Sequence, residues 1–197
     1  QLETLVFVFG LMAIMTIYVI TFPKYKSQDA MLVFTGIFYV AVMLSYIYKV
    51  RVAEDGKYIV WLVFVSSWGN DTFAYFTGVL FGKHKMAPKL SPKKSVEGAV
   101  GGVTGATLLG IIYGFIISGR MSGIFVHPVW TFAIASFIGA LLSIIGDLAA
   151  SAIKRNYDIK DYGKLIPGHG GIMDRFDSVI FTAPAVYWAV YLISHIM

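Results

Sequence analysis

The sequence contains no cysteine, which excludes disulfide bonds and thiolate metal sites. It is also poor in charge, because only 14% of its 197 residues are Asp, Glu, Lys or Arg. A soluble domain usually carries about 25% charged residues. Hydrophobic residues make up 57% of the chain. The composition therefore excludes an ordinary soluble domain and indicates an integral membrane protein.

Six hydrophobic segments come close to the length of about 20 residues that crosses a bilayer as a helix. They are longer than the alternating segments of about ten residues that form membrane barrels. No basic region or small-residue cleavage site precedes the first segment, so we expect it to be a true span. The sequence predicts an all-α, polytopic membrane protein. The expected spans are Leu2–Phe22, Ala30–Tyr48, Tyr58–Phe81, Val100–Ser118, Val129–Ala152 and Ser178–Met197.

The basic residues are distributed unevenly among the connecting segments. Twelve of the sixteen Lys and Arg residues fall on one predicted side, namely Lys24, Lys26, Lys83, Lys85, Lys89, Lys93, Lys94, Lys154, Arg155, Lys160, Lys164 and Arg175. The other side has Lys49, Arg51, Lys57 and Arg120. Because basic loops stay in the cytoplasm, the first side is expected to be cytoplasmic.

Ionisable residues inside the predicted spans are costly and mark candidate sites. Asp71 lies in the third span, where packing against a neighbouring helix is the alternative interpretation. In the fifth span and just after it, Ser143, Asp147, Ser151 and Lys154 are three or four residues apart and share one helix face. A direct Asp147–Lys154 ion pair would have to reach across about 10 Å along the helix axis. This distance favours a functional site over a structural ion pair.

Asp174 and Asp177, which are three residues apart, lie just before the sixth span, where its helix is expected to open. Their position also suits the positive end of the helix dipole, which is the alternative explanation. Together with Asp147 they form a set of oxygen ligands that suits Mg²⁺. Gly170 and Gly171 would let a phosphate or a metal approach the backbone. His169 could bind phosphate, hold a carboxylate or be an ordinary loop residue.

A second polar segment, "APKLSPKKSVEGAVGG", precedes the fourth span. Lys89, Lys93 and Lys94 are point charges suited to phosphate, and Ser91 adds a hydroxyl group. Glu97 marks the entry to the helix. The glycines that follow repeat at a spacing typical of close helix packing.

Carboxylates, lysines and a glycine loop on one membrane face are the groups that phosphoryl or nucleotidyl transfer requires. Neither a Walker A loop nor the spaced-aspartate signature of CDP-alcohol phosphotransferases occurs in the sequence. A transporter is the rival class, although its charges would lie nearer the midplane of the bilayer.

The run from Ser151 to Asp177, "SAIKRNYDIKDYGKLIPGHGGIMDRFD", resembles the signature of the phosphatidate cytidylyltransferases, or CDP-diacylglycerol synthases. That signature is S-x-x-K-R-x-x-x-x-K-D-x-x-x-x-x-P-x-H-G-G-x-x-D-R-x-D, and each fixed position is met. "SPKKSVEGAVGG" and "NDTFAYFTGVLFGKH" resemble two further elements of the family. The likeness covers the last two thirds of the chain. It implies a generic region, residues 1–57, and a catalytic region, residues 58–197.

The resemblance implies that CTP and phosphatidic acid react to CDP-diacylglycerol and pyrophosphate with Mg²⁺, in phospholipid biosynthesis. It implies that Asp147 and Asp174 bind the metal, shared with a second cation such as K⁺, and that Asp177 is a ligand or an anchor. Asp71 would complete the acidic pocket or orient a lysine.

The same likeness implies which residues hold the triphosphate and the lipid phosphate. Lys154 and Arg175 are expected to act in catalysis, and the substrate-binding candidates are Ser91, Lys93, Lys94, Glu97, Asp71, Arg155, Lys160, His169, Gly170 and Gly171.

The expected partners are CTP, phosphatidic acid, the lipid bilayer and a second copy of the chain, and no nucleic acid. The expected location is the inner, or cytoplasmic, membrane of the cell. Family members usually carry more N-terminal helices, so the chain is expected to be short or truncated.

Overall fold

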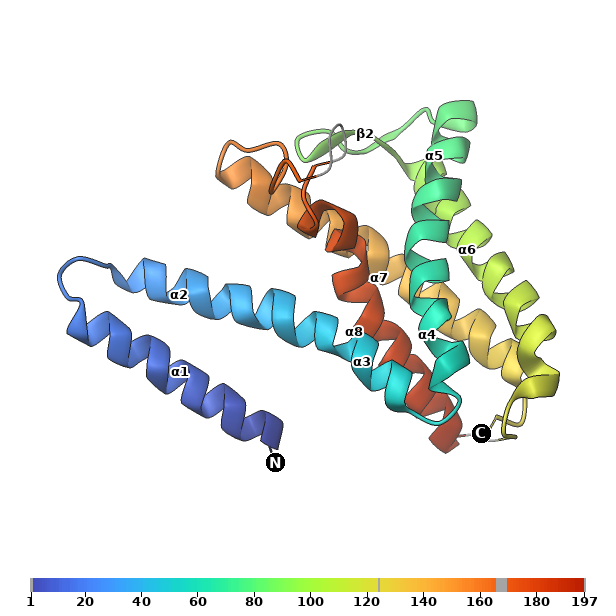
Figure 1. Cartoon of the computed structure of the whole chain (residues 1–197). Coiled ribbons are helices and arrows are strands. Elements are labelled where there is room, and N and C mark those ends of the chain that lie inside the picture. The colour runs from blue at the N-terminus through green and yellow to red at the C-terminus, as the bar shows by residue number, and fades with distance from the viewer. Residues whose placement is uncertain (1, 124, 166–169, 197) are drawn as a thin grey trace. The chain divides into compact units, whose positions relative to one another are not determined.

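The computed structural model describes residues 2–123, 125–165 and 170–196 (Figure 1). By its internal packing the chain forms two units, Gln1–Met43 and Leu44–Met197. This division differs from the functional division expected after residue 57, which stays a prediction.

The first unit contains helices α1 (Leu2–Ile20) and α2 (Ser27–Gly36) and a π-helix, η1 (Ile37–Val42). The Asp29 carboxylate accepts a hydrogen bond of 2.8 Å from the backbone N–H of Lys26, which caps α2. Phe7 of α1 stacks on Phe38 of η1, with ring centroids 4.7 Å apart. None of the described residues of α2 and η1 is buried. Exposed hydrophobic helices of this kind suit a lipid environment.

The second unit contains the remaining elements. α4, the π-helix η2 and α5 follow one another without a break, so residues 56–81 form one helical segment. The elements are α3 (Met43–Val52), α4 (Gly56–Phe64), η2 (Val65–Gly69), α5 (Asn70–Phe81), β1 (Lys85–Ala87), β2 (Ser91–Ser95), α6 (Val96–Ile117), the 3-10 helix η3 (Ser118–Arg120), α7 (Pro128–Asn156) and α8 (Met173–Ile196).

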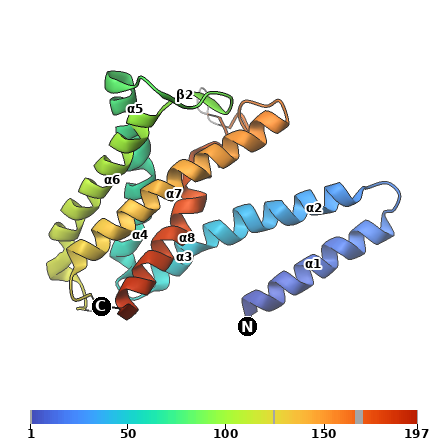
Figure 2. The same ribbon diagram turned by 180° about the vertical axis from the view of Figure 1, so that it is seen from behind.

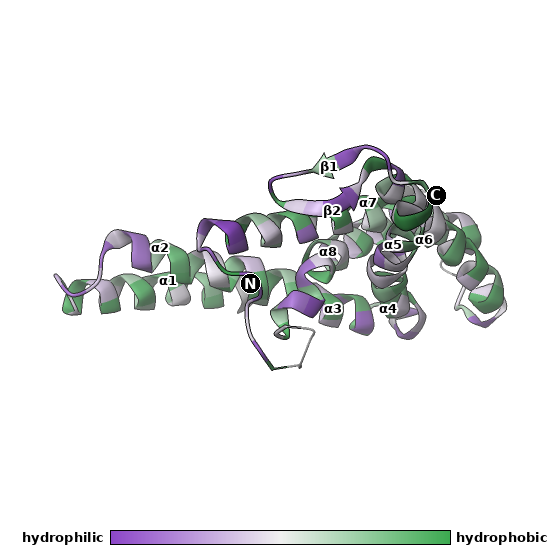
Figure 3. Ribbon diagram, turned by 90° about the horizontal axis from the view of Figure 1, so that it is seen from above, coloured by the Kyte–Doolittle hydropathy of each residue, from purple (hydrophilic) through white to green (hydrophobic). Residues whose placement is uncertain are grey.

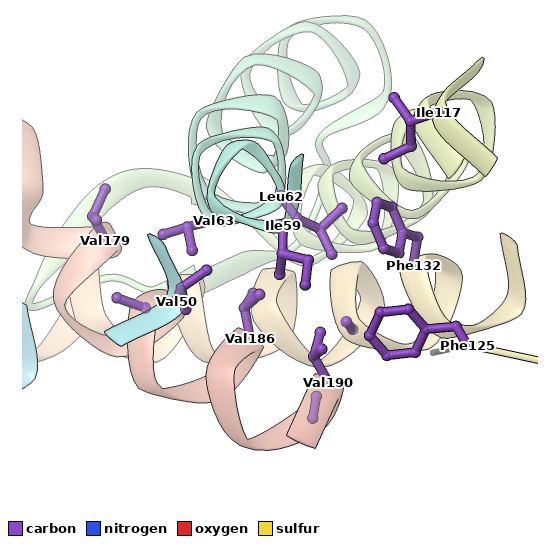
Figure 4. Packing of buried hydrophobic residues seen from close by; sticks show 13 residues of the cluster. Val50, Ile59, Leu62, Val63, Ile117, Phe125, Phe132, Val179, Val186 and Val190 are labelled. Atoms are coloured by element: carbon purple, nitrogen blue, oxygen red, sulfur yellow. The ribbon is translucent and has the colours of Figure 1, made fainter. Parts of the chain in front are cut away.

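A hydrophobic core lies where α4 packs between α3, α7 and α8 (Figure 4). Leu62 and Val63 of α4 are fully buried there, as are Phe132 of α7 and Val186 of α8. α7 also packs along α6, and α6 along α5, so α7 lies between α6 and α8 (Figures 1 and 2). This arrangement fixes the helices that carry the polar side chains.

The prediction of a helical membrane protein is confirmed, and among the described residues each of the six expected segments is mostly helical. Among the described residues, four helices are long and hydrophobic enough to cross a membrane: Ser27–Val52, Val96–Arg120, Pro128–Asn156 and Met173–His195. Leu5–Ile20 is a shorter apolar helix. Residues 56–81 are not among the four, because the polar stretch from Ser66 to Asp71 lowers their mean hydropathy. The expected number of six spans therefore stays a prediction.

β1 and β2 form an antiparallel hairpin that was not predicted. It lies at the same end of the second unit as the connection between α7 and α8, whereas the connections α3–α4 and α6–α7 lie at the opposite end (Figures 1 and 2). Hydrophilic residues predominate on the hairpin, in contrast to the largely hydrophobic helices (Figure 3). The hairpin end therefore gathers the polar groups.

Candidate active site

A cavity of about 510 Å³ lies beneath the hairpin. Its walls come from α5, both strands, the start of α6 and the middle of α7. Six of the polar residues that line it are Asn70, Asp71, Ser91, Lys93, Lys94 and Asp147. Tyr75 and Val79 of α5 line the same cavity and are 67% and 68% exposed. Charged groups and lipid-facing side chains thus share one cavity wall.

Asp147 lies at the centre of the polar groups. Its carboxylate forms an ion pair with the Lys94 ammonium of the hairpin, and it accepts a hydrogen bond of 3.4 Å from the Ser151 hydroxyl. Asp71 of α5 lines the same cavity. The polar face predicted for this helix is therefore confirmed as a face that meets other polar groups.

Lys154 joins α7 to α8. Its ammonium donates a hydrogen bond of 2.9 Å to Oδ1 of Asp174 and lies 3.9 Å from Oδ2 of Asp177. Only 10% of the Lys154 side chain and 5% of the Asp174 side chain are exposed. Lys154 therefore pairs with acids of α8, and the direct pair with Asp147 that its spacing disfavoured is not formed.

The connection from α7 to α8 holds Asp174 in place. Oδ2 of Asp174 accepts hydrogen bonds from the backbone N–H groups of Tyr162, at 2.8 Å, and Gly171, at 2.9 Å. Gly170 has φ of +84°, and a Cβ atom there would lie 2.9 Å from the same oxygen. The group that lies against the backbone at Gly170 and Gly171 is thus a carboxylate of the protein itself, and the approach of a phosphate or a metal there stays a prediction.

Tyr162 is a site residue that the sequence did not reveal. Its ring centroid lies 5.3 Å from the Lys154 ammonium, and its hydroxyl donates a hydrogen bond of 3.1 Å to the carbonyl of Ala150. Burial, with Asp174 and Asp177 nearby, raises the pKa of the Tyr162 hydroxyl, so it keeps its proton at neutral pH. The signal could have been an aromatic residue within the charged run before "PGHGG", but its role depends on tertiary contacts.

Buried hydroxyl and amide groups extend from the site into the bundle. The Ser178 hydroxyl donates to Asp71 at 3.3 Å and lies 2.7 Å from the Ser67 hydroxyl of η2. The Asn70 amide donates to the Ser143 hydroxyl at 3.4 Å. Such bonds between helices hold polar residues within a membrane. Asp71 is thus bonded to a neighbouring helix and also part of the cavity wall, and its role in a site stays a prediction.

The other predicted residues lie in the cavity wall, at the base of the hairpin or at the exposed surface. Ser91 and Lys93 line the cavity, while Glu97 contacts the base of the hairpin. Arg155, Lys160 and Arg175 are exposed, and the Arg155 guanidinium donates to the carbonyl of Ile159 at 3.0 Å. His169 lies outside the described residues.

The site brings four carboxylates and several lysines together. Asp71, Asp147, Asp174 and Asp177 are the carboxylates; Lys94 and Lys154 pair with three of them, and Lys85 and Lys93 line the cavity. The described residues contain no group of three or more His, Asp or Glu side chains already arranged as metal ligands. The carboxylate oxygens are nevertheless the kind of donor that a divalent cation such as Mg²⁺ prefers. Lysines on the hairpin add cations suited to phosphate.

Comparison with known proteins agrees with this chemistry. Residues 1–193 match the model of the cytidylyltransferase family. The phosphatidate cytidylyltransferase of Staphylococcus haemolyticus is 33% identical over 161 residues, which cover 82% of this chain and 59% of the relative. That of Thermotoga maritima is 34% identical over 152 residues, covering 77% and 56%.

The chain spans less than two thirds of the length of these relatives. The match to the family model nevertheless extends over nearly the whole chain, from the apolar N-terminal helices to α8. The resemblance predicted from the motifs is confirmed, and the chain belongs to the cytidylyltransferase family.

Proposed function

We propose that the chain carries the catalytic region of a phosphatidate cytidylyltransferase. In this reaction a phosphate oxygen of phosphatidic acid attacks the α-phosphorus of CTP, the bond to pyrophosphate breaks, and CDP-diacylglycerol forms. The observation that carries the proposal is the cavity in which hairpin lysines face carboxylates of α5 and α7, next to lipid-facing residues of α5. The names of the relatives support the choice of substrates.

The basic residues of the site would bind and neutralise the phosphates of the substrates. Lys93 and Lys94 would neutralise phosphate oxygens in the cavity, and such fixed charges stabilise a phosphoryl-transfer transition state. Lys154 of α7 would add a further cation, and its hydrogen bond to Asp174 would orient the ammonium group. Arg155, Lys160 and Arg175 are exposed at the same end and would attract the anionic substrates. No protein nucleophile is required, because the lipid phosphate is ionised at neutral pH.

A divalent cation belongs to the proposal. Asp147, Asp174 and Asp177 are the proposed ligands of Mg²⁺, with K⁺ as a second cation. Oδ2 of Asp177 lies 3.9 Å from the Lys154 ammonium, which is too long for a hydrogen bond and leaves this oxygen suited to a metal. Asp174 already accepts three hydrogen bonds. When bound, Mg²⁺ would supply positive charge to the phosphate oxygens.

The setting follows from the same groups. We propose that the chain spans the inner membrane and that its hairpin end faces the cytoplasm, where CTP is available. A second copy of the chain is the proposed protein partner. Tyr75 and Val79 would let the acyl chains of phosphatidic acid remain in the bilayer while the phosphate reaches Lys93 and Lys94.

The test is release of pyrophosphate by the purified chain in liposomes that contain phosphatidic acid, with CTP and Mg²⁺. Asp147→Asn and Asp174→Asn should each lower the rate at least about 100-fold, as loss of a group that stabilises developing charge does. Lys93→Ala and Lys94→Ala should lower it more than Lys24→Ala, the matched control. Absence of cytidylyl incorporation into any phospholipid would refute the proposal and favour transport.

Binding of the metal can be tested without turnover. If Mg²⁺ binds the folded chain, a concentration 100 times its Kd should stabilise the fold by about 2.7 kcal/mol, seen as a higher melting temperature. Asp177→Asn should reduce this shift, whereas Asp29→Asn in α2 should leave it unchanged. An unaltered shift in Asp177→Asn would remove Asp177 from the ligand set.

A further inference from the structure

Glu97 is engaged with the backbone at the base of the hairpin. Its Oε2 accepts hydrogen bonds from the backbone N–H of Lys83, at 3.1 Å, and of His84, at 3.2 Å. Its Oε1 lies 2.6 Å from Nδ1 of the His84 ring. Because a carboxylate can only accept, the Nδ1–H group donates to it. Both oxygens of Glu97 are therefore occupied by the protein.

These contacts tie the two ends of the hairpin together. The carbonyl of His84 accepts a hydrogen bond of 2.9 Å from the backbone N–H of Val96, next to Glu97 in the sequence. One end of the hairpin is thus joined to the first turn of α6 through both backbone and side chain. We call the contacts among Lys83, His84, Val96 and Glu97 the hairpin clamp.

The hairpin needs such support. Its strands have only three and five residues, and an isolated two-stranded hairpin is marginally stable in water. The pairing is also irregular, because the register shifts between Lys85 and Ala87. Two prolines, Pro88 and Pro92, lack the N–H group that a strand ladder uses. The clamp therefore replaces stability that the ladder itself does not provide.

The hairpin carries much of the positive wall of the cavity. Lys85, Lys93 and Lys94 all line it, and Lys94 reaches Asp147 of α7. Fixed charges contribute more to binding and catalysis than charges that must first become ordered. The position of the hairpin therefore decides whether its lysines meet the phosphates.

We propose that Glu97 and His84 are positioning residues that hold the lysine hairpin over the cavity. This inference rests on the proposed function and deepens it. It assigns to Glu97 a role different from the substrate contact that the sequence indicated. A free carboxylate in contact with a triphosphate would repel it, whereas a carboxylate occupied by the clamp aligns the neighbouring cations.

The first experiment measures opening of the hairpin directly. The segment contains five lysines, Lys83, Lys85, Lys89, Lys93 and Lys94, so trypsin can report its opening in the detergent-solubilised chain. Glu97→Ala should raise the rate of cleavage in this segment about tenfold, because charge-assisted hydrogen bonds are lost. His84→Ala and Glu97→Gln should raise it less, since each keeps part of the clamp. Glu54→Ala, at the opposite end of the second unit, is the matched control.

The second experiment measures CTP use by the same variants. Glu97→Ala should raise KM for CTP about tenfold, and Glu97→Gln should recover part of the loss. Saturating CTP should slow the cleavage of Glu97→Ala, because bound phosphates would hold the lysines in place.

The outcomes distinguish a positioning role of Glu97 from direct contact with the substrate. A raised KM with a wild-type cleavage rate would mean that Glu97 contacts the substrate and would overturn the inference. Faster cleavage with unchanged kinetics would also overturn it, because the clamp would then have no effect on the site. A wild-type chain without cytidylyltransferase activity would refute the proposed function, and the cleavage rates would still decide whether the clamp holds the hairpin.

Discussion

At the scale of single residues, Lys154 shows how the protein accommodates a charge inside a membrane-spanning helix. It is only 8% exposed, and Asp174, Asp177 and the Tyr162 ring surround its ammonium. Lys154→Met would keep most of the volume but leave two carboxylates without their cation. We expect it to destabilise the fold by about 3–5 kcal/mol, measured by thermal or denaturant unfolding in detergent.

Lys94 provides the matched comparison, because it also pairs with an aspartate but its side chain is 26% exposed. Lys94→Met should cost about 1 kcal/mol or less in stability, since water screens the pair, while it should lower activity strongly. Equal losses of stability in the two variants would show that enclosure of Lys154 does not determine its energetic role.

At the scale of elements, the contact between α5 and α6 depends on backbone approach at Gly102. A Cβ atom there would lie 2.5 Å from the Asn70 side-chain oxygen and 2.8 Å from the Asn70 carbonyl oxygen. The backbone cannot move away as a flexible side chain could. Gly102→Ala should therefore separate the helices and destabilise the fold by about 1–3 kcal/mol, seen as a lower melting temperature.

Gly119→Ala is the control for this prediction, because nothing lies within 4 Å of a Cβ atom at that position. A melting temperature of Gly102→Ala equal to that of the control would contradict the close packing of α5 on α6. The glycine repeat was predicted to serve helix packing, and the contacts of Gly102 confirm this.

The elements also show how far the sequence could be read. Long apolar runs predicted the helices, because burying backbone groups in lipid leaves few alternatives. Spacing of three or four residues predicted the polar face of α7, since helical geometry fixes which residues share a face. The hairpin was missed because its lysines and prolines lack the alternation of apolar and polar residues that signals strands. Tyr162 and His84 were missed because tertiary contacts define their roles.

At the scale of the whole molecule, the distribution of charge agrees with the position of the site. Lysine and arginine residues gather on the hairpin and on the connection between α7 and α8, which lie at one end of the second unit (Figures 1 and 2). The connections at the other end carry few. By the positive-inside rule, this distribution supports the proposed cytoplasmic orientation of the hairpin end.

The absence of native cysteines allows this orientation to be tested with single substitutions. Lys89→Cys and Lys164→Cys, both exposed at the hairpin end, should react with a membrane-impermeant maleimide in inside-out vesicles. Arg120→Cys, exposed at the opposite end, should react in right-side-out vesicles. Each substitution removes one positive charge. The difference between the two sides, twelve basic residues against four, therefore changes by only one. Labelling of Lys89→Cys and Arg120→Cys from the same side would contradict the spanning arrangement, because the two positions lie at opposite ends of one helix, α6, and its flanking connections.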